Sequence, residues 1–557
     1  MPLDWTVSAP LSSLSSSPAD DTPTVAIALA KVPAAVPETD EAWSGPLLLN
    51  PGGPGGSGVD FAIALGREVQ AVVGRTHSVI GFDPRGVNNT TPQTTCFPSE
   101  TARMIWWLRA GGRVAGYSPH HLDLAVELAR ARSLGSVCEA VVSDSPGAAV
   151  AYAGTPNVAR DMLAIVDAAW ASAGRPGARG LRFWGFSYGT ALGQTFAAMF
   201  PDRVERLVLD GVVDLDDYYA GGWRTNLQDA DRVIAAFYAY CAAAASACPL
   251  AAPTPALVAR RLHRLLARLR REPVAVFGPS APDWVADADV RTVIFWALYS
   301  PVLRFPIAAE ALAALEKGDG SKVAAIVHIP YECPCALDGA AGVAGDAGCP
   351  DGSEKPNTGA EADSAILCQD GGSGADGGRS NATLAEMAAY VDELKGQSEM
   401  VAGNWARIQM ACTGWTVKAR GLAPRYRQHP QRPPTETKNP ILFVSTRLDP
   451  VTPLCNAEKA RTVFAGAGLL VQESEGHCSI SAPSACSAAR IGRYFADGLV
   501  DGFTAVCGAD ATPWSAEASV MLRGEGRDEG EEEKHSPAAV AMALVRKWQP
   551  VVPGGIR

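Results

Sequence analysis

Residues Leu181–Phe200, LRFWGFSYGTALGQTFAAMF, give the clearest structural signal in this chain of 557 residues. The first seven residues form a short apolar run typical of a buried strand, and the small residues that follow predict a helix. Between them lies the sequence GFSYG (185–189), in which a glycine stands two positions from the central serine on each side. A turn that links a strand directly to a helix is too tight for bulky side chains at those positions. The pattern therefore predicts that Ser187 projects above the end of a strand as a nucleophile.

Short apolar strands recur on both sides of this turn and alternate with helical segments. A chain of this kind predicts a mostly parallel sheet covered by helices on both faces. The predicted strands are Thr24–Val32, Pro46–Asn50, Ser78–Asp83, Leu181–Ser187, Arg203–Val213, Pro440–Thr446 and Gly468–Gly476, and Val158–Ser172 is a predicted helix.

The pattern changes near Asp214, after which the chain reads mainly as helix until about residue 400. We therefore expect one α/β domain interrupted by a mainly helical cap, rather than a row of separate domains. A Gly/Asp-rich stretch inside the insertion, Asp338–Arg379, is expected to be loop. The expected division is a flexible N-terminal segment (1–22), the first part of the core (23–214), the helical cap (215–405), the second part of the core (406–510) and a C-terminal tail (511–557).

Composition argues against several classes of protein. Apolar residues make up 47% and charged residues 19%, as in an ordinary globular protein rather than a disordered one. The formal net charge of −11 argues against nucleic acid as the main partner, because phosphate binding relies on basic patches. No apolar run reaches the roughly 18 residues that a membrane-spanning helix needs.

Cysteine usage and the N-terminus point to different compartments. The 13 cysteines form no paired C-x2-C zinc pattern, which favours disulfides and an oxidising compartment. The N-terminus has neither the basic region nor the apolar region of a signal peptide. We expect a secreted protein, and a cytoplasmic protein with free thiols is the alternative.

A glycine-rich loop, NPGGPGGSG (50–58), follows the predicted strand Pro46–Asn50. Acyl transfer passes through an oxyanion that needs preorganised N–H donors, and bare glycine amides can approach a substrate closely. We expect Gly53, or Gly52, to supply one donor and Tyr188, which follows the nucleophile, to supply the other. Phosphate binding is excluded because no G-K-[ST] follows and the spacing is not that of a dinucleotide-binding loop.

A candidate acid and a candidate base follow two predicted strands near the C-terminus. Asp449 closes the strand ILFVST, and His477 follows the strand GLLVQESEG. With Ser187 they give the chain order Ser, Asp, His. In that arrangement the histidine takes the serine proton and passes it to the leaving group, while the aspartate fixes the histidine tautomer. Asp210 and Asp214, after the strand that follows the nucleophile, are alternative acid positions.

Together these residues resemble the α/β-hydrolase exopeptidases, which include proline iminopeptidases and the secreted tripeptidyl aminopeptidases. The match to the tripeptidyl aminopeptidase-like group spans about Thr24 to Cys507. The matching stretches are LLLNPGGPGGSGVDF, VIGFDPRGVNNTTP, FWGFSYGTALGQTFAAMFPDRVERLVLDGVVD, AILCQD, ILFVSTRLDPVTP and EGHCSI. The resemblance implies an α/β-hydrolase fold, with Ser187 as nucleophile, Asp449 as acid and His477 as base. It also suggests removal of short peptides, such as tripeptides, from a free N-terminus.

The cysteines suggest bridges by their proximity in sequence, although connectivity cannot be derived from sequence alone. Cys241–Cys248 and Cys486–Cys507 are plausible pairs, and Cys96–Cys138 and Cys455–Cys478 are possible ones. A bridge at Cys478 would hold the loop next to His477, and we state this as a hypothesis. Compared with the group, the opening segment with its export signal and cysteine pair is shortened or absent.

An exopeptidase that recognises a free N-terminus needs a carboxylate at a fixed distance from the nucleophile, to hold the substrate ammonium. No candidate is favoured by its spacing. The candidates are Asp214, Asp216 and Asp217 at the start of the cap, and Glu332 and Asp370 within it.

The sequence thus predicts a serine hydrolase that cleaves peptide bonds through an acyl-enzyme and needs neither a metal nor a cofactor. Its expected partner is a peptide with a free N-terminus, and the oligomeric state is left open. An esterase or lactonase with the same triad is one alternative, because the cap sets the substrate. A catalytically inactive binding protein on this fold is another. Epoxide hydrolases and dehalogenases are disfavoured because they carry Asp at the position of Ser187.

Overall fold

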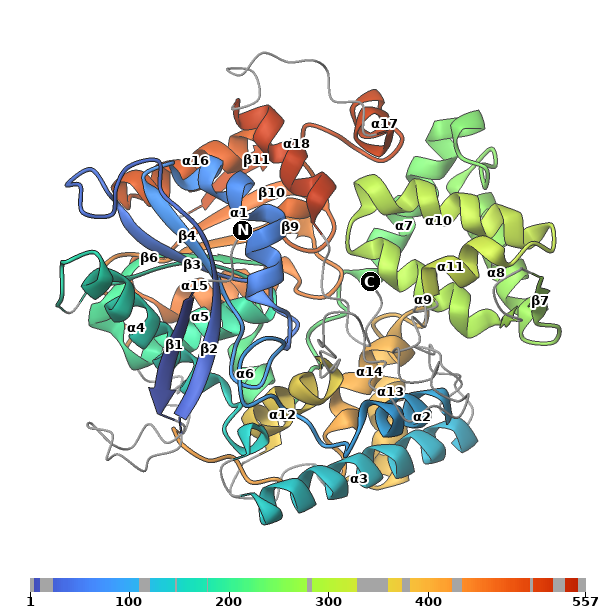
Figure 1. The fold of residues 1–557 in the computed structure, drawn as a ribbon. Helices are drawn as coiled ribbons and strands as arrows, with labels where there is room; N and C mark the ends of the chain where they lie inside the picture. The colour runs from blue at the N-terminus through green and yellow to red at the C-terminus, as the bar shows by residue number, and fades with distance from the viewer. Residues whose placement is uncertain are drawn as a thin grey trace, which may run out of the picture.

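The structure is a computed structural model that describes residues 5–10, 24–109, 121–145, 148–177, 179–277, 283–327, 359–372, 381–422, 433–500, 504–523 and 536–548. In these residues nine strands form one sheet in the order β1-β2-β4-β3-β5-β6-β9-β10-β11 (Figure 1). β2 runs antiparallel to both of its neighbours, and the strands from β4 to β11 are parallel to one another. The strands are β1 (Trp5–Pro10), β2 (Thr24–Val32), β3 (Gly45–Asn50), β4 (His77–Phe82), β5 (Leu181–Phe186), β6 (Val204–Asp210), β9 (Leu442–Leu448), β10 (Gly468–Glu475) and β11 (Thr504–Gly508).

The predicted mostly parallel sheet is confirmed, and the predicted strands end within a few residues of the observed ones. β1 and β11 are additional strands at the two edges of the sheet. Trp5–Pro10, which fall in the segment expected to be flexible, instead form β1. Pairing with β1 covers the backbone edge of β2, which would otherwise offer unpaired N–H and C=O groups.

Helices cover both faces of the sheet because the central strands are buried on both sides. Every residue of β3 and β4 is buried, and in β5 only Arg182 is partly exposed. One face carries α1 (Gly58–Val73), α16 (Ala485–Asp497) and α18 (Pro537–Lys547), and the other carries α4 (Thr155–Ser172), α5 (Tyr188–Met199) and α15 (Leu454–Val463). The region expected to be a C-terminal tail thus adds α18 to the core, and it also contains α17 (Ala516–Arg523).

A mainly helical layer follows the carboxyl end of β6 and returns to the sheet at β9 (Figure 1). It holds α6 (Leu215–Tyr219), α7 (Ala230–Ala244), α8 (Pro255–Leu269), α9 (Asp287–Leu298), α10 (Pro301–Glu316), α11 (Ser321–Val327), α12 (Gly359–Gly372), α13 (Leu384–Lys395), α14 (Ala402–Ala411) and the hairpin of β7 (Val274–Val276) and β8 (Asp283–Val285). None of the helices in the described residues is both long and apolar enough to cross a membrane.

Two features of this layer differ from the expected division. α2 (Glu100–Arg109) and α3 (His121–Asp144) come from the stretch expected to be core, yet α3 contacts α13 and α14 in the cap. α12 falls inside Asp338–Arg379, which the sequence predicts to be loop. That prediction is wrong for residues 359–372, because the flanking glycines and aspartates conceal a short run of small and apolar residues that pack as a helix.

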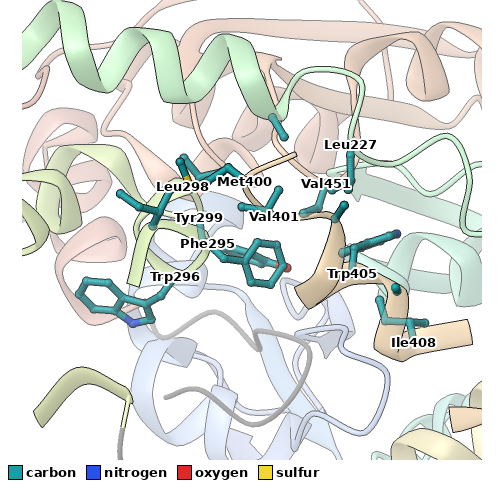
Figure 2. Close-up of a cluster of buried hydrophobic side chains, with 14 of the residues drawn as sticks. Leu227, Phe295, Trp296, Leu298, Tyr299, Met400, Val401, Trp405, Ile408 and Val451 are labelled. Carbon is teal, nitrogen blue, oxygen red and sulfur yellow. The ribbon is translucent and has the colours of Figure 1, made fainter. Parts of the chain in front are cut away.

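A continuous apolar cluster holds the cap together (Figure 2). Phe295 on α9 packs against Trp405 on α14, with ring centroids 6.4 Å apart. Tyr299, Trp405 and Val451 belong to this cluster and also lie in the wall of the cavity described below. The packing of the cap therefore shapes the space above the sheet.

Four disulfides join described residues. They are Cys96–Cys138, Cys241–Cys248, Cys368–Cys412 and Cys486–Cys507. Three of the expected pairs are confirmed, and Cys368–Cys412, which ties α12 to the end of α14, is an additional one. The expected Cys455–Cys478 pair is wrong, since both residues are free thiols. Cys478 is buried, and its Sγ donates a hydrogen bond to the Asp210 carbonyl oxygen at 3.3 Å.

Candidate active site

Ser187 lies at the sharp turn between β5 and α5. Its backbone has φ 55° and ψ −123°, a conformation that few non-glycine residues adopt. A Cβ on Gly185 would come within 2.5 Å of the Gly189 carbonyl oxygen, and one on Gly189 within 2.9 Å of the Asn50 carbonyl oxygen. The G-x-S-x-G spacing is therefore required by close backbone approach. The Ser187 N–H donates to the Asp210 carbonyl oxygen at 2.9 Å, which fixes the turn against β6.

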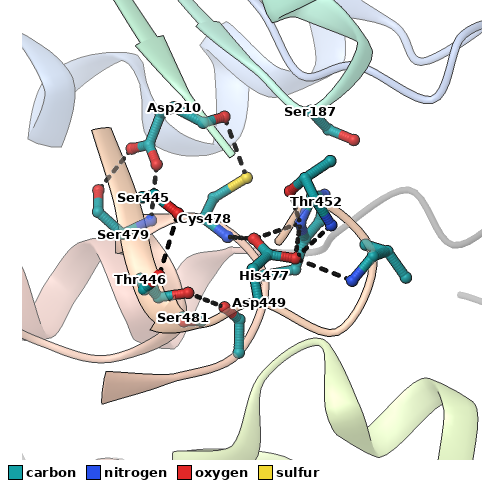
Figure 3. A network of polar contacts seen from close by, with 12 residues as sticks. Ser187, Asp210, Ser445, Thr446, Asp449, Thr452, His477, Cys478, Ser479 and Ser481 are labelled. Atoms are coloured by element: carbon teal, nitrogen blue, oxygen red, sulfur yellow. Dashed lines mark hydrogen bonds and ion pairs between the residues drawn. The ribbon is translucent and has the colours of Figure 1, made fainter. Parts of the chain in front are cut away.

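His477 and Asp449 form a buried pair beyond the carboxyl ends of β10 and β9 (Figure 3). The carboxylate is fully buried and His477 is 2% exposed. The His477 Nδ1 lies 3.0 and 2.9 Å from the two carboxylate oxygens. Because Nδ1 donates to the carboxylate, Nε2 is the nitrogen that can accept a proton. The pair has the geometry in which an aspartate orients a histidine base.

Backbone N–H groups hold the carboxylate of Asp449 in place. Val451 and Thr452 donate to its Oδ1 at 3.0 and 2.8 Å, and Cys478 donates to its Oδ2 at 3.0 Å. The turn after β9 and the loop that carries His477 are therefore both hydrogen-bonded to the Asp449 carboxylate. The hypothesis that a disulfide at Cys478 holds this loop is wrong, because Cys478 is a free thiol. Hydrogen bonds such as that from the Cys478 N–H to Asp449 hold the loop instead.

Asp210, an alternative acid position, contacts a different residue. Ser479 donates to its carboxylate from the N–H at 2.8 Å and from the hydroxyl at 2.5 Å (Figure 3). Burial raises the pKa of Asp210 to about 6. In the part of the chain that the structure describes, the carboxylate hydrogen-bonded to the His477 ring is that of Asp449. Asp210 fixes the loop two residues after the histidine.

The His477 ring is held by aromatic neighbours, and its outer nitrogen is unpartnered. The Tyr299 ring meets it edge-on at 5.1 Å between centroids, and the Trp548 ring lies at 6.4 Å. Nε2 is buried and has no hydrogen-bond partner among the described residues, so the bond to Ser187 is not formed. Such bonds are often long without substrate and tighten in the complex. The nitrogen is therefore available to the serine.

Hydrogen bonding in the glycine-rich loop shows which of Gly52 and Gly53 has an N–H group available to an oxyanion. The Gly52 N–H donates to Oδ1 of Asn50 at 2.9 Å, so this amide is occupied. The N–H groups of Gly53 and Tyr188 have no acceptor among the residues that the structure describes. Both residues line the cavity that contains Ser187. Gly53 therefore fits the donor role better than Gly52, with Tyr188 as the second donor.

The cavity above Ser187 encloses about 420 Å³, open solvent at its mouth included. Core and cap both contribute to its wall, and much of the cap side is apolar, with Trp405 and Ile408 on α14 (Figure 2). Asp363 on α12 is the one charged side chain in the described wall. A mostly apolar cavity with a few placed polar groups is typical of a site for a small ligand.

The carboxylates at the start of the cap form hydrogen bonds or ion pairs with other residues of the protein. Asp214 caps α6 and forms an ion pair with Lys459 at 2.7 Å. The same lysine contacts Asp216 at 2.8 Å. Asp217 accepts hydrogen bonds from backbone N–H groups of the following turn. Glu332, another expected amine-binding residue, lies outside the described residues.

α12 carries one expected and one unexpected carboxylate. Asp370 accepts hydrogen bonds from the Thr155 N–H at 2.9 Å, from the Thr155 hydroxyl and from the Tyr218 hydroxyl at 2.6 Å. Burial raises the pKa of Asp370 to about 6. Asp363 lies in the cavity wall and was missed because its segment read as loop. The spacing of Asp363, Leu367 and Asp370 on one helix face is the signal that could have revealed it.

Two families match this chain in separate stretches. Residues 45–240 match the family described as "alpha/beta hydrolase fold", and residues 398–507 match the one described as "TAP-like protein". The chain therefore has the α/β-hydrolase fold. Its C-terminal part, which carries Asp449 and His477, is TAP-like and confirms the resemblance to the tripeptidyl aminopeptidase-like group.

Curated relatives include peptidases and an esterase. The chain is 33% identical over 270 residues to serine protease Hip1 of Mycobacterium tuberculosis, covering 46% of this chain and 47% of that protein. It is 34% identical over 172 residues to tripeptidyl aminopeptidase of Streptomyces lividans, covering 30% and 29%. It is 27% identical over 477 residues to carboxylesterase B of Mycobacterium tuberculosis, covering 84% and 80%. The chain thus matches less than half of the length of the first two relatives.

Proposed function

We propose that this protein is a serine hydrolase that acts through an acyl-enzyme. The observation that carries the proposal is that Ser187, Asp449 and His477 follow the carboxyl ends of the parallel strands β5, β9 and β10, with Ser187 in the wall of a cavity under the cap. Ser187 attacks the carbonyl carbon, and Nε2 of His477 takes the proton and returns it to the leaving group. Asp449 stabilises the imidazolium, and the Gly53 and Tyr188 N–H groups donate to the oxyanion.

The substrate that we propose is a short peptide with a free N-terminus, from which the enzyme releases a short peptide such as a tripeptide. Two of the relatives named above are peptidases, and one of these is a tripeptidyl aminopeptidase. A small cavity under a cap accepts the end of a short or unstructured chain more readily than an internal bond of a folded protein.

An esterase is the second candidate, and one observation favours it. The match to carboxylesterase B covers 84% of this chain, whereas the matches to the two peptidases cover 46% and 30%. The same triad and oxyanion donors cleave esters and amides, so the cap is the element that would distinguish the two substrates.

We further propose that the protein matures in an oxidising compartment, as a secreted protein does. Four disulfides among the described residues support this, because such bridges rarely persist under cytosolic conditions. Expression with and without an export signal, followed by mapping of the bridges, tests it. A fully active, fully reduced cytosolic product would contradict it.

The test of the activity is a matched chromogenic panel, measured with the wild-type protein and with Ser187→Ala. The panel holds mono-, di- and tripeptidyl amides with free N-termini, their N-acetylated forms and a short-chain ester. We expect Ser187-dependent release from free tripeptidyl amides that is much slower from the acetylated forms. Ester turnover without amide cleavage would favour the esterase, and no turnover by folded protein would leave a binding protein as the explanation.

A further inference from the structure

α12 lies directly against the glycine-rich loop that borders the nucleophile. A Cβ placed on Gly55 would come within 3.2 Å of the Gly359 carbonyl oxygen and 3.3 Å of the Asp363 nitrogen. The first turns of α12 therefore touch the loop that also supplies Gly53 to the cavity wall. A side chain on this part of the helix can reach a substrate bound at Ser187.

The rotation of α12 about its own axis is fixed by Asp370. Its carboxylate is bonded to Thr155 on α4 and to Tyr218 on α6, so one face of the helix is held toward the core. Residues four and seven positions apart share a helix face. Asp363 and Leu367 therefore point to the same side as Asp370, and both line the cavity that contains Ser187.

Asp363 differs from the other carboxylates near the site in having no polar partner among the described residues. Within the described residues it forms no hydrogen bond or ion pair, whereas Asp214, Asp370 and Asp449 each have several partners. Burial, followed by the charges of Asp370 and Asp363, raises the pKa of Tyr188, so Asp363 lies within electrostatic reach of the residue next to the nucleophile.

We propose that Asp363 binds the α-ammonium group of the substrate and thereby selects peptides with a free N-terminus. The inference rests on the proposed peptidase function and names the residue that confers its specificity. A partly buried carboxylate with no partner among the described residues is stabilised by a bound ammonium group. A charge-assisted hydrogen bond between the two then fixes the distance of the ammonium group from Ser187. That distance then sets how many residues precede the cleaved bond.

The ionisation behaviour of Asp363 agrees with this assignment. Burial raises the pKa of Asp363 to about 8. A cation in contact with the carboxylate favours its charged form and lowers the pKa again. Burial thus favours the neutral carboxyl group, and contact with an ammonium group favours the carboxylate that binds it.

The first experiment measures kcat/KM of Asp363→Asn on matched tri-alanine p-nitroanilides with a free and with an acetylated N-terminus. We expect a loss of about 100-fold on the free substrate, as for removal of one partner of a buried charge pair, and little change on the acetylated one. Asp363→Glu retains the charge and should recover part of the loss. Equal losses on both substrates, or no loss on either, would overturn the proposal.

The second experiment needs no turnover and separates this proposal from the proposed function. Calorimetry measures binding of tri-alanine amide, free or N-acetylated, to Ser187→Ala and to Ser187→Ala/Asp363→Asn. We expect the free peptide to bind at least tenfold more weakly to the double variant, and the acetylated peptide to bind both alike. If the peptides bind both proteins equally, or bind neither, Asp363 is not the amine site, even if the wild-type protein proves to be a peptidase. If binding depends on Asp363 but no peptide is cleaved, the proposed function fails and the amine site stands.

Discussion

Two buried carboxylates, Asp449 and Asp210, lie at the ends of neighbouring strands and are engaged in different bonds. Asp449 is bonded to the His477 ring, and Asp210 is bonded to Ser479. A carboxylate bonded to Nδ1 selects the tautomer that leaves Nε2 free for the nucleophile, whereas one bonded to a serine orders the backbone. Their replacement by the isosteric amide should therefore have unequal consequences.

We predict that Asp449→Asn lowers kcat by about 10⁴-fold, because the amide favours the wrong histidine tautomer. Asp210→Asn is the matched control, since its side chain can keep both contacts with Ser479. We expect its kcat to stay within the same order of magnitude as that of the wild-type protein. Steady-state kinetics on one substrate decide, and a larger loss from Asp210→Asn would assign the acid to Asp210.

The pH dependence of substrate capture is a second prediction at this scale. Burial raises the pKa of Asp363 to about 8, and a free peptide amine has a pKa of about 7.7–8.0. Capture requires the ionised carboxylate, which forms as the pH rises, and the protonated amine, which is lost as the pH rises. We expect kcat/KM for free-N-terminus substrates to rise to a maximum near about pH 8 and then fall.

In Asp363→Asn the rising limb that belongs to this carboxyl should disappear, and acetylated substrates should lack the falling limb that belongs to the amine. Profiles of kcat/KM from pH 5 to 10 on both substrates provide the measurement. Identical profiles for the wild-type protein and Asp363→Asn would contradict the prediction.

At the scale of helices and strands, the Asp370 cluster (Asp370, Thr155, Tyr218 and Tyr188) joins the cap to the core. Thr155 Oγ1 lies 2.6 Å from the Tyr188 hydroxyl, and Tyr218 donates to Asp370 at 2.6 Å. α4, α5, α6 and α12 thus meet at one buried carboxylate. A lost partner leaves that carboxylate partly unsatisfied in an apolar setting, which is costly.

We predict that Tyr218→Phe lowers the free energy of unfolding by about 1.5–3 kcal/mol, because it removes a hydrogen bond to a charged group. Tyr219→Phe is the matched control, since the Tyr219 hydroxyl lies 2.9 Å from the neutral Thr195 hydroxyl. Its cost should be about 0.5–1.5 kcal/mol. Urea denaturation of both variants supplies the comparison, and equal costs would mean that Asp370 does not depend on Tyr218.

The elements show what sequence can and cannot predict. The strands and the turn at Ser187 were predictable because local apolar runs and glycines dictate them. The partners of Asp370 were not, because Thr155 is more than two hundred positions away in sequence. For the same reason the Cys368–Cys412 bridge followed only from tertiary packing.

At the scale of the whole molecule, the free thiols provide a test of the described disulfide pattern. Cys455 is exposed, and Cys478 is buried next to the nucleophile turn. We predict that an alkylating reagent labels Cys455 in the folded, unreduced protein, and labels Cys478 only after denaturation. Peptide mass mapping without reduction provides the measurement. Detection of a peptide in which Cys455 and Cys478 are disulfide-linked would contradict this prediction.

The packing of α18 has a consequence for synthesis of the protein. α18 covers part of α1, and Lys547 forms an ion pair with Glu68. The ribosome delivers α18 long after α1, and at about 5–20 residues per second the interval between them is on the order of a minute. During that time the part of α1 that packs against α18 is uncovered on the nascent chain, whereas β2 and β4, which also pack against α1, are made soon before and after it. We therefore expect α18 to dock late, onto a core in which α1 already packs against β2 and β4.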